Sequence, residues 1–229
     1  MSIVKFEFDK EKDLRNIWNT ANTTTHYGHD FKSKVSKNLI EICENKKYEE
    51  CREELLKTMS SLYKNLLLKI AIKTLNKAWD GIEKDYFARL EKITKQKLSI
   101  KKVKAYLTTI SRCPYNPDSK ETFFFCNFFW SLSSQMQTAG HELMHIHLHN
   151  SPWWDKVEIE IGKEKTHDLK ESMTQLLNLE FRDLWIVEDR GYDAHAELRK
   201  YISSEWKRKK NFNLLTENCI KWIKKNGVK

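Results

Sequence analysis

Glycine and proline are scarce in this chain. Of its 229 residues, only 6 are glycine and 3 are proline, so few positions favour tight turns or interrupt helices. Charged residues make up 32% of the sequence and hydrophobic residues 40%, which is enough apolar surface for a sizeable core and argues against disorder. The composition therefore predicts long helices with solvated faces.

Cysteines and long apolar runs are also limited. The five cysteines are odd in number and show no C-x-x-C spacing, which argues against a disulfide framework and against a thiolate zinc site. Residues 1–8 are too short and too charged for a signal peptide, and no run of eighteen apolar residues occurs. We expect a cytoplasmic protein with reduced thiols and no membrane contact.

Negative charge is in the minority. Lys and Arg number 41 against 32 for Asp and Glu, a formal net charge of +9, and the excess is visible in residues 95–104 and 207–210. Such charge favours acidic partners such as nucleic acid. No aromatic-interleaved RNA motif or helix-turn-helix signature accompanies it, so lysine-rich solvated helices are the preferred explanation of the charge. We expect a weak acidic partner at most, and the oligomeric state stays open.

The N-terminal part of the chain is predicted to form one strand followed by helices. Residues 4–8 alternate between apolar and polar side chains, as in a short strand, and Asp9 can cap a helix that continues through Trp18. From Phe31 to about Lys97, apolar side chains recur at steps of three and four residues. We predict two or three helices in this region.

The pattern changes to that of strands after Ser99. Residues 103–107 alternate, and residues 122–129 are aromatic and β-favouring. Because Pro114 and Pro117 mark a turn between them, the two runs are predicted to form a hairpin. The aromatic run either binds a peptide by strand addition or is covered on both faces.

Helical patterns return in the C-terminal half. One helix is predicted from about Ser133 to Asn150, a second from Thr166 to about Asp183, and two more follow after a break at Gly191. The predicted fold is therefore α+β and mainly helical. The chain is predicted to form one domain over 1–229, with a helical region at 31–97, a catalytic core at 99–183 and C-terminal helices at 190–229.

The helix that begins near residue 133 carries the segment His141-Glu142-Leu143-Met144-His145. Two histidines four residues apart on a helix lie about 40° apart around the axis and roughly 6 Å apart along it. Both imidazoles can therefore reach one ion. A catalytic zinc site uses three protein ligands and leaves the fourth position to water, and Glu142 can accept the proton of that water. We predict Zn²⁺ bound by His141 and His145.

Other residues around this segment receive different roles. His147 points about 200° away from His145, and His149 lies about 12 Å along the axis from His141, so neither is expected to bind the same ion. His149 is explained as a polar residue near the helix end. Gly140 precedes the first predicted ligand, where a larger side chain would obstruct the helix face that binds the metal.

The third ligand decides the type of zinc site. The metzincin pattern needs Gly at position 148 and His at position 151, but this chain has Leu148 and Ser151, so that type is excluded. The helix after Thr166 offers two carboxylates, Asp168 and Glu171, on one polar stripe. One of them is expected to complete the site.

Residues 170–175, Lys-Glu-Ser-Met-Thr-Gln, resemble the Asn-Glu-x-x-Ser-Asp helix of thermolysin-like gluzincins, which are zincin metallopeptidases. The resemblance covers residues 99–183, and it implies Glu171 as the third ligand, a backing helix, a short sheet, an active-site helix and a glutamate helix. In that family the final Asp supports a ligating histidine. Here Gln175 stands in its place and can accept the same hydrogen bond without a charge.

Two gluzincin branches are similar to this chain. Single-domain mini-gluzincins are comparably compact, and residues 141–149 resemble the H-E-L-G-H-x-x-L-H stretch of the ImmA/IrrE family of intracellular regulatory peptidases. That family has Gly where Met144 stands, and its Ala-Asn-x-Phe-Ala stretch is absent here.

The resemblance implies a zinc metallopeptidase that hydrolyses peptide bonds in a peptide or protein substrate. Glu142 would take the proton of a zinc-activated water and deliver it to the leaving amine. His195 and Tyr192 are candidates for stabilising the oxyanion, like the His and Tyr of thermolysin-like enzymes. The alternative is a basic nucleic-acid- or protein-binding regulatory module with a structural or vestigial metal site, which Asp168 would close as a fourth ligand.

Overall fold

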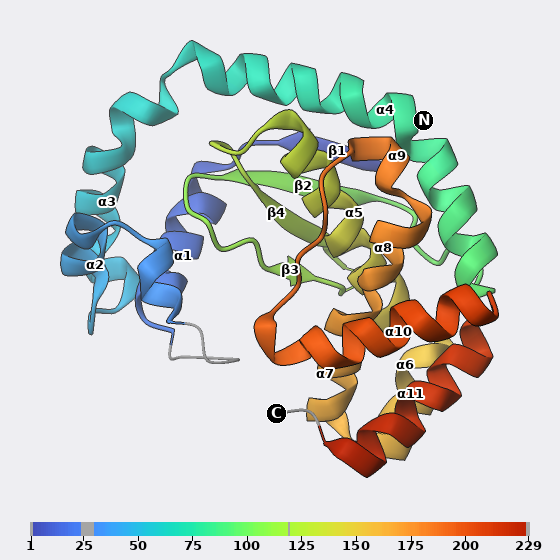
Figure 1. Ribbon diagram of the computed structural model, residues 1–229. Helices are drawn as coiled ribbons and strands as arrows, with labels where there is room; N and C mark the ends of the chain where they lie inside the picture. The colour runs from blue at the N-terminus through green and yellow to red at the C-terminus, as the bar shows by residue number, and fades with distance from the viewer. Residues whose placement is uncertain (1, 24–29, 119, 228–229) are drawn as a thin grey trace. The chain divides into compact units, whose positions relative to one another are not determined.

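The computed structural model describes residues 2–23, 30–118 and 120–227. In this part of the chain the protein is mainly helical, with one small mixed sheet (Figure 1), and this confirms the predicted α+β class. The chain divides into two compact units. We name them the sheet unit, Ser2–Trp79 with Lys102–Gln135, and the helical unit, Asp80–Lys101 with Met136–Lys229.

The sheet unit contains four strands in the order β1-β2-β4-β3. Their bounds are Val4–Glu7 for β1, Val103–Thr108 for β2, Tyr115–Asn116 for β3 and Phe123–Asn127 for β4. β2 pairs in parallel with both β1 and β4, whereas β3 and β4 are antiparallel.

The predicted hairpin between residues 103–107 and 122–129 is therefore wrong. These two runs are parallel neighbours, with Lys104 opposite Phe123. The turn signal at Pro117 is genuine, but it connects the short strand β3 to β4. Because parallel strands need a long return connection, residues 109–122 carry the chain back to the start of β4. Both faces of β4 are buried, as the covered-strand alternative required.

Helices complete the sheet unit. They are α1 (Lys10–Ala21), the 3₁₀ helix η1 (Phe31–Lys34), α2 (Lys37–Cys43), α3 (Tyr48–Tyr63) and the first part of α4 (Leu66–Thr94). The Asp9 carboxylate accepts hydrogen bonds from two backbone amides of the first turn, which confirms it as the N-cap of α1. Apolar side chains of α1, α2 and α3 share one core, which includes Leu14, Leu39 and Leu55.

The helical unit contains the remaining helices. They are α5 (Leu132–His149, whose first turn belongs to the sheet unit), α6 (Pro152–Ile161), α7 (Lys163–Met173), α8 (Gln175–Glu180), α9 (Arg182–Trp185), the 3₁₀ helix η2 (Asp193–His195), α10 (Ala196–Arg208) and α11 (Phe212–Asn226). The helix predicted from Thr166 to Asp183 is in fact α7, α8 and α9. The stretch around Trp153, for which no element was predicted, forms α6, because Pro152 occupies the first helical turn, where its missing N–H costs nothing.

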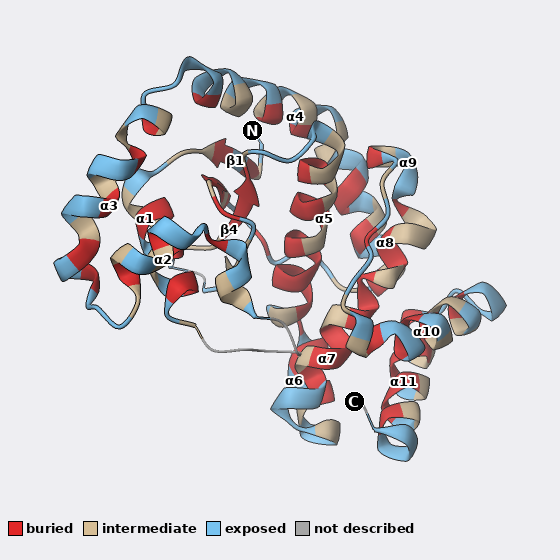
Figure 2. Ribbon diagram, turned by 60° about the vertical axis from the view of Figure 1, so that its left-hand side comes forward, coloured by how far each residue is buried: buried red, intermediate tan, exposed pale blue. Residues whose placement is uncertain are grey.

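Helix α5 is buried along most of its length (Figure 2). Gly140 allows the Trp185 ring to approach its backbone so closely that a Cβ at this position would lie 2.5 Å from the ring atom Cη2. The Tyr86 hydroxyl of α4 donates to the Gly140 carbonyl at 2.6 Å. The small residue is thus explained by packing against Trp185 and Tyr86, which corrects the expectation that it keeps the metal face open.

The length and composition of the helices bear on membrane crossing. Among the described residues, no helix combines the length and the apolar character that a bilayer span requires.

Candidate metal centre

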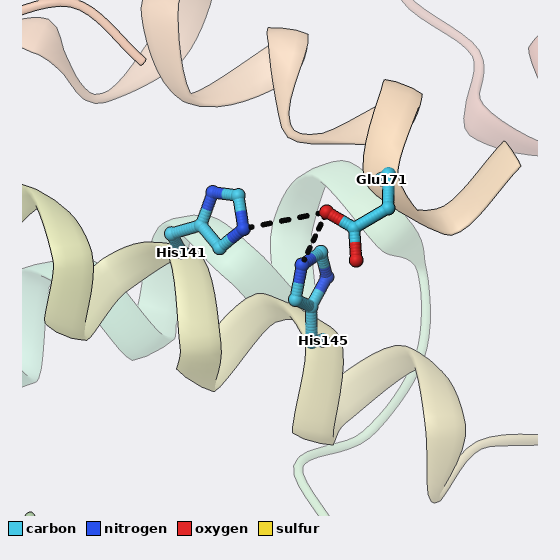
Figure 3. Close-up of side chains that lie close together, drawn as sticks. All are labelled: His141, His145 and Glu171. Carbon is cyan, nitrogen blue, oxygen red and sulfur yellow. Dashed lines mark hydrogen bonds and ion pairs between the residues drawn. The ribbon is translucent and has the colours of Figure 1, made fainter. Parts of the chain in front are cut away.

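Helices α5 and α7 bring together the three predicted ligands. His141 and His145 point from consecutive turns of α5 toward Glu171 of α7 (Figure 3). Glu171 Oε2 lies 3.2 Å from His145 Nε2 and 3.6 Å from His141 Nε2. One potential ligand atom from each of the three residues lies within 4.8 Å of the other two.

The donor set and its spacing fit a zinc ion. Zinc binds imidazole nitrogen and carboxylate oxygen at about 2.0–2.2 Å in tetrahedral geometry, so two ligand atoms of one ion are roughly 3.3 Å apart. The two separations at Glu171 Oε2 bracket this value. Within the described chain the group has three members and does not include Asp168. Three ligands leave a tetrahedral ion one position for water.

Asp189 fixes the orientation of His141, and it was missed by the sequence analysis. Its Oδ2 lies 2.5 Å from His141 Nδ1. Because a carboxylate can only accept, the proton is assigned to Nδ1, which leaves Nε2 to face Glu171. The expected partner was Gln175, and that expectation is wrong: Gln175 donates to Ser203 Oγ and accepts from Asn178.

The position of Asp189 is itself determined by a buried polar network. The Asn178 amide accepts from the Asp189 backbone N–H at 2.8 Å and donates to its carbonyl at 2.7 Å. The Arg199 guanidinium donates to the Asp189 carbonyl and carboxylate, and to Thr174 Oγ1. Asp189 is not part of any recognisable sequence motif. Its role as the partner of His141 becomes apparent only from the packing of α8 and α10 against its segment.

Lys170 is a second residue without a sequence signal. Its side chain is only 3% exposed, and its Nζ lies 2.9 Å from Glu171 Oε1. The two oxygens of Glu171 therefore face different partners, because Oε1 meets the ammonium and Oε2 meets the histidines. This arrangement leaves Oε2 of Glu171 as the oxygen that would bind a metal ion together with the two histidines.

The two histidines differ in protonation. Burial lowers the pKa of His145 to about 3, so its ring is neutral, which is the form that binds a metal. Burial also acts to lower the pKa of His141, but the charge of Asp189 and its hydrogen bond outweigh burial and raise that pKa well above its usual value. A metal ion must therefore displace a proton at His141.

Glu142 is buried next to these groups. Burial, assisted by the charge of Glu171, raises its pKa to about 8, while the charge of His141 acts in the opposite direction. A carboxyl group whose pKa is near neutrality is suited to accept and return a proton at physiological pH.

The two predicted oxyanion donors lie beside α7. His195 Nε2 is 3.2 Å from Asp168 Oδ1, and both residues are buried. The Tyr192 ring packs edge-on against His195 at 5.7 Å between centroids. Asp168 precedes Glu171 by one turn. It was expected near the helix start, which is wrong, because α7 begins at Lys163.

The remaining histidines of α5 are outside the cluster, as predicted. His147 is fully buried with its Nε2 3.0 Å from Thr94 Oγ1, and the His149 ring packs on Trp154 with 4.2 Å between centroids.

Comparison of the chain with known protein families, with curated proteins and with solved structures found no match in any of the three. Function is therefore inferred from the residues of the cluster.

Proposed function

We propose that this protein is a zinc-dependent metallopeptidase of the gluzincin type, in which His141, His145 and Glu171 hold the metal. The observation that carries the proposal is the convergence of two imidazoles and one carboxylate from α5 and α7, with Glu142 buried beside them. The zincin-like core, the zinc ion and the peptide substrate are parts of this proposal.

Each residue has a distinct task in the proposed reaction. Bound zinc would supply a water of lowered pKa and polarise the scissile carbonyl. Glu142 accepts the proton of that water and returns it to the leaving amine. Asp189 holds His141 in the tautomer that directs Nε2 toward Glu171, and Lys170 keeps one oxygen of Glu171 occupied. His195 and Tyr192 remain the proposed donors to the oxyanion.

The competing proposal is a binding module with a closed structural metal site. A closed site needs a fourth protein ligand, and Asp168 was the candidate. Its carboxylate instead accepts a hydrogen bond from His195. A group of three ligands favours the catalytic proposal over the structural one.

Metal analysis tests the ligand assignment. We expect about one zinc per chain in the wild type at neutral pH, and loss of zinc in His145→Ala and Glu171→Gln, because each removes a ligand. Asp168→Asn is the matched control, since it changes a neighbouring carboxylate of the same helix in the same way, and it should retain zinc. Equal zinc in all four proteins would refute the assignment.

Replacement of the proposed base tests the reaction. Glu142→Gln should keep zinc and fold but lower peptidase turnover about a thousandfold or more, because the amide cannot accept the proton of the water. Glu164→Gln, at an exposed position of α7, is the control and should be as active as the wild type. Unchanged turnover in Glu142→Gln would reject the proposed base.

A further inference from the structure

A surface pocket of about 570 Å³ lies in the helical unit. One of its lining residues, Arg199, donates to the Asp189 carboxylate, and the other oxygen of that carboxylate faces His141 Nδ1. One face of α10 forms most of the pocket wall. The residues of this face recur at steps of three and four, as the positions of one helical stripe do. Gln175 of α8 and Arg190 complete the lining.

The pocket is strongly basic. Its lining contains four cationic side chains, from Arg190, Arg199, Lys200 and Lys207, and no carboxylate among the described residues. Arg199 is balanced by Asp189, and Lys200 has an exposed pair with Glu197. The side chains of Arg190 and Lys207 have no hydrogen bond or ion pair with any residue that the structure describes. The pocket thus holds an excess of positive charge that an anion would neutralise.

The neutral groups of the lining are also suited to an anion. Ser203 and Ser204 lie on the α10 stripe between Lys200 and Lys207. Ser203 Oγ accepts a hydrogen bond from Gln175 at 2.9 Å, so its own O–H remains able to donate into the pocket. Guanidinium, ammonium and hydroxyl donors are the groups that bind phosphate oxygens.

The spacing of the cations fits more than one phosphate. Lys200 and Lys207 are seven residues apart on a helix, which is roughly 10 Å along its axis, so two phosphate groups placed along the α10 stripe can each meet a different cation. The volume is within the range of small-molecule sites. No aromatic side chain lines the pocket in the described chain, so the platform on which nucleic-acid bases stack is missing.

We propose that this pocket binds a small metabolite that carries two phosphate groups, such as a sugar bisphosphate. One phosphate is bound near Arg190 and Lys200, and the other near Lys207 and Ser204. The site is separate from the three proposed metal ligands and does not depend on the proposed peptidase activity.

Calorimetric titration with fructose 1,6-bisphosphate at about 0.15 M salt tests the proposal. The double variant Arg190→Gln with Lys207→Gln should raise the dissociation constant about tenfold or more, because it removes two charged donors. The control double variant Lys221→Gln with Lys225→Gln removes the same charge from α11 of the same unit and should change the constant less than twofold. Ser204→Ala keeps the net charge and should weaken binding by about threefold, which is one hydrogen bond.

Three outcomes would overturn the proposal. Equal weakening in the two double variants would mean that only the net charge attracts the probe. Loss of binding in His145→Ala would place the probe at the histidine cluster, so this variant also separates a failure of the pocket from a failure of the metal site. A single-stranded RNA oligonucleotide that binds more tightly than the bisphosphate, with the same dependence on Arg190 and Lys207, would assign the pocket to nucleic acid.

Discussion

Glu171, which is partly buried, and Asp189, which is buried, are carboxylates whose charge is maintained by neighbouring cations. Burial alone would raise the pKa of Glu171, but the Lys170 ammonium and the hydrogen bonds from the two histidines lower it well below its usual value. Burial acts in the same way on Asp189, and the charges of His141 and Arg199 lower its pKa. Both groups are therefore anionic at neutral pH, one facing the proposed ion and the other supporting a proposed ligand.

Asp189→Asn should weaken zinc binding by about tenfold to a hundredfold, the usual effect of removing a carboxylate that supports a ligating histidine. The amide cannot offer a negative charge to His141 Nδ1. Gln175→Ala is the control, because Gln175 contacts Ser203 and Asn178, and its zinc affinity should change less than twofold. Competition with a chromophoric chelator measures both affinities, with thermal melting to confirm folding. A larger effect in Gln175→Ala would return the supporting role to that residue.

The residues predicted from the sequence are those whose spacing lies within one helix. His141, Glu142 and His145 form a local pattern, whereas Glu171 was preferred to Asp168 because residues 170–175 resemble the glutamate helix of gluzincins. Asp189 and Lys170 were not predicted, because their roles depend on how separate segments pack. A lysine adjacent to an acidic residue is ordinary in a chain this rich in both, and only its burial distinguishes it.

At the scale of elements, α5 is held in place by the residues around Gly140. The Trp185 ring is stacked on Phe181, with an interplanar angle of 3°, and Tyr86 packs against both of these rings. The neighbouring position on α5 is His141. Close packing of these three rings therefore fixes the turn of α5 that presents the first histidine.

Gly140→Ala should lower the free energy of unfolding by about 1–3 kcal/mol, because the new methyl group would overlap a buried ring that has little room to move. Gly81→Ala in α4 is the matched control, since nothing lies within 4 Å of the place that its new methyl group would occupy. That substitution should stabilise the protein by about 0.5–1 kcal/mol through helix propensity. Urea unfolding measures both. A stabilising effect at both positions would show that Trp185 moves aside without cost.

The elements that were predicted incorrectly lack a local signal. Breaks at Thr174 and Phe181 separate α7, α8 and α9, but neither position has the glycine or proline that usually ends a helix. At Thr174, packing of both α7 and α8 against α10 takes the place of such a signal. The incorrect prediction of a hairpin between β2 and β4 has a different cause. A turn signal shows that the chain reverses its direction, but it does not show which strand the chain then pairs with.

At the scale of the whole molecule, each unit combines two separate stretches of chain. The regions predicted from the sequence were contiguous, whereas the sheet unit includes residues on either side of 80–101. Periodicity reports the local conformation of a segment and contains no information on which distant segment it packs against. Which chain segments belong to the same unit is therefore decided by three-dimensional packing and not by the order of segments in the sequence.

The sheet unit has its own buried carboxylate, Asp13, which joins three elements. It accepts hydrogen bonds from Thr108 Oγ1, from the N–H and Oγ1 of Thr109, and from the Tyr63 hydroxyl, at 2.7–2.9 Å. All four donors are neutral. Burial raises the pKa of Asp13 above its usual value of 3.8, and the hydrogen bonds oppose this effect only in part.

The raised pKa determines how the stability contribution of Asp13 depends on pH. The folded protein binds the Asp13 proton more tightly than the unfolded chain does, so this contribution is fully present below pH 3.8 and is lost as the pH rises through the folded-state pKa. The free energy of unfolding of the wild type, relative to Asp13→Asn, should therefore increase as the pH falls from 7 to 4. Urea unfolding at a series of pH values measures it, with Asp80→Asn, at an exposed position of α4, as the control. Asp13→Ala should cost roughly 1–3 kcal/mol, because it leaves buried donors unpaired. If the advantage of the wild type over Asp13→Asn instead grew with rising pH, Asp13 would be stabilised as an anion, and burial would not dominate its energetics.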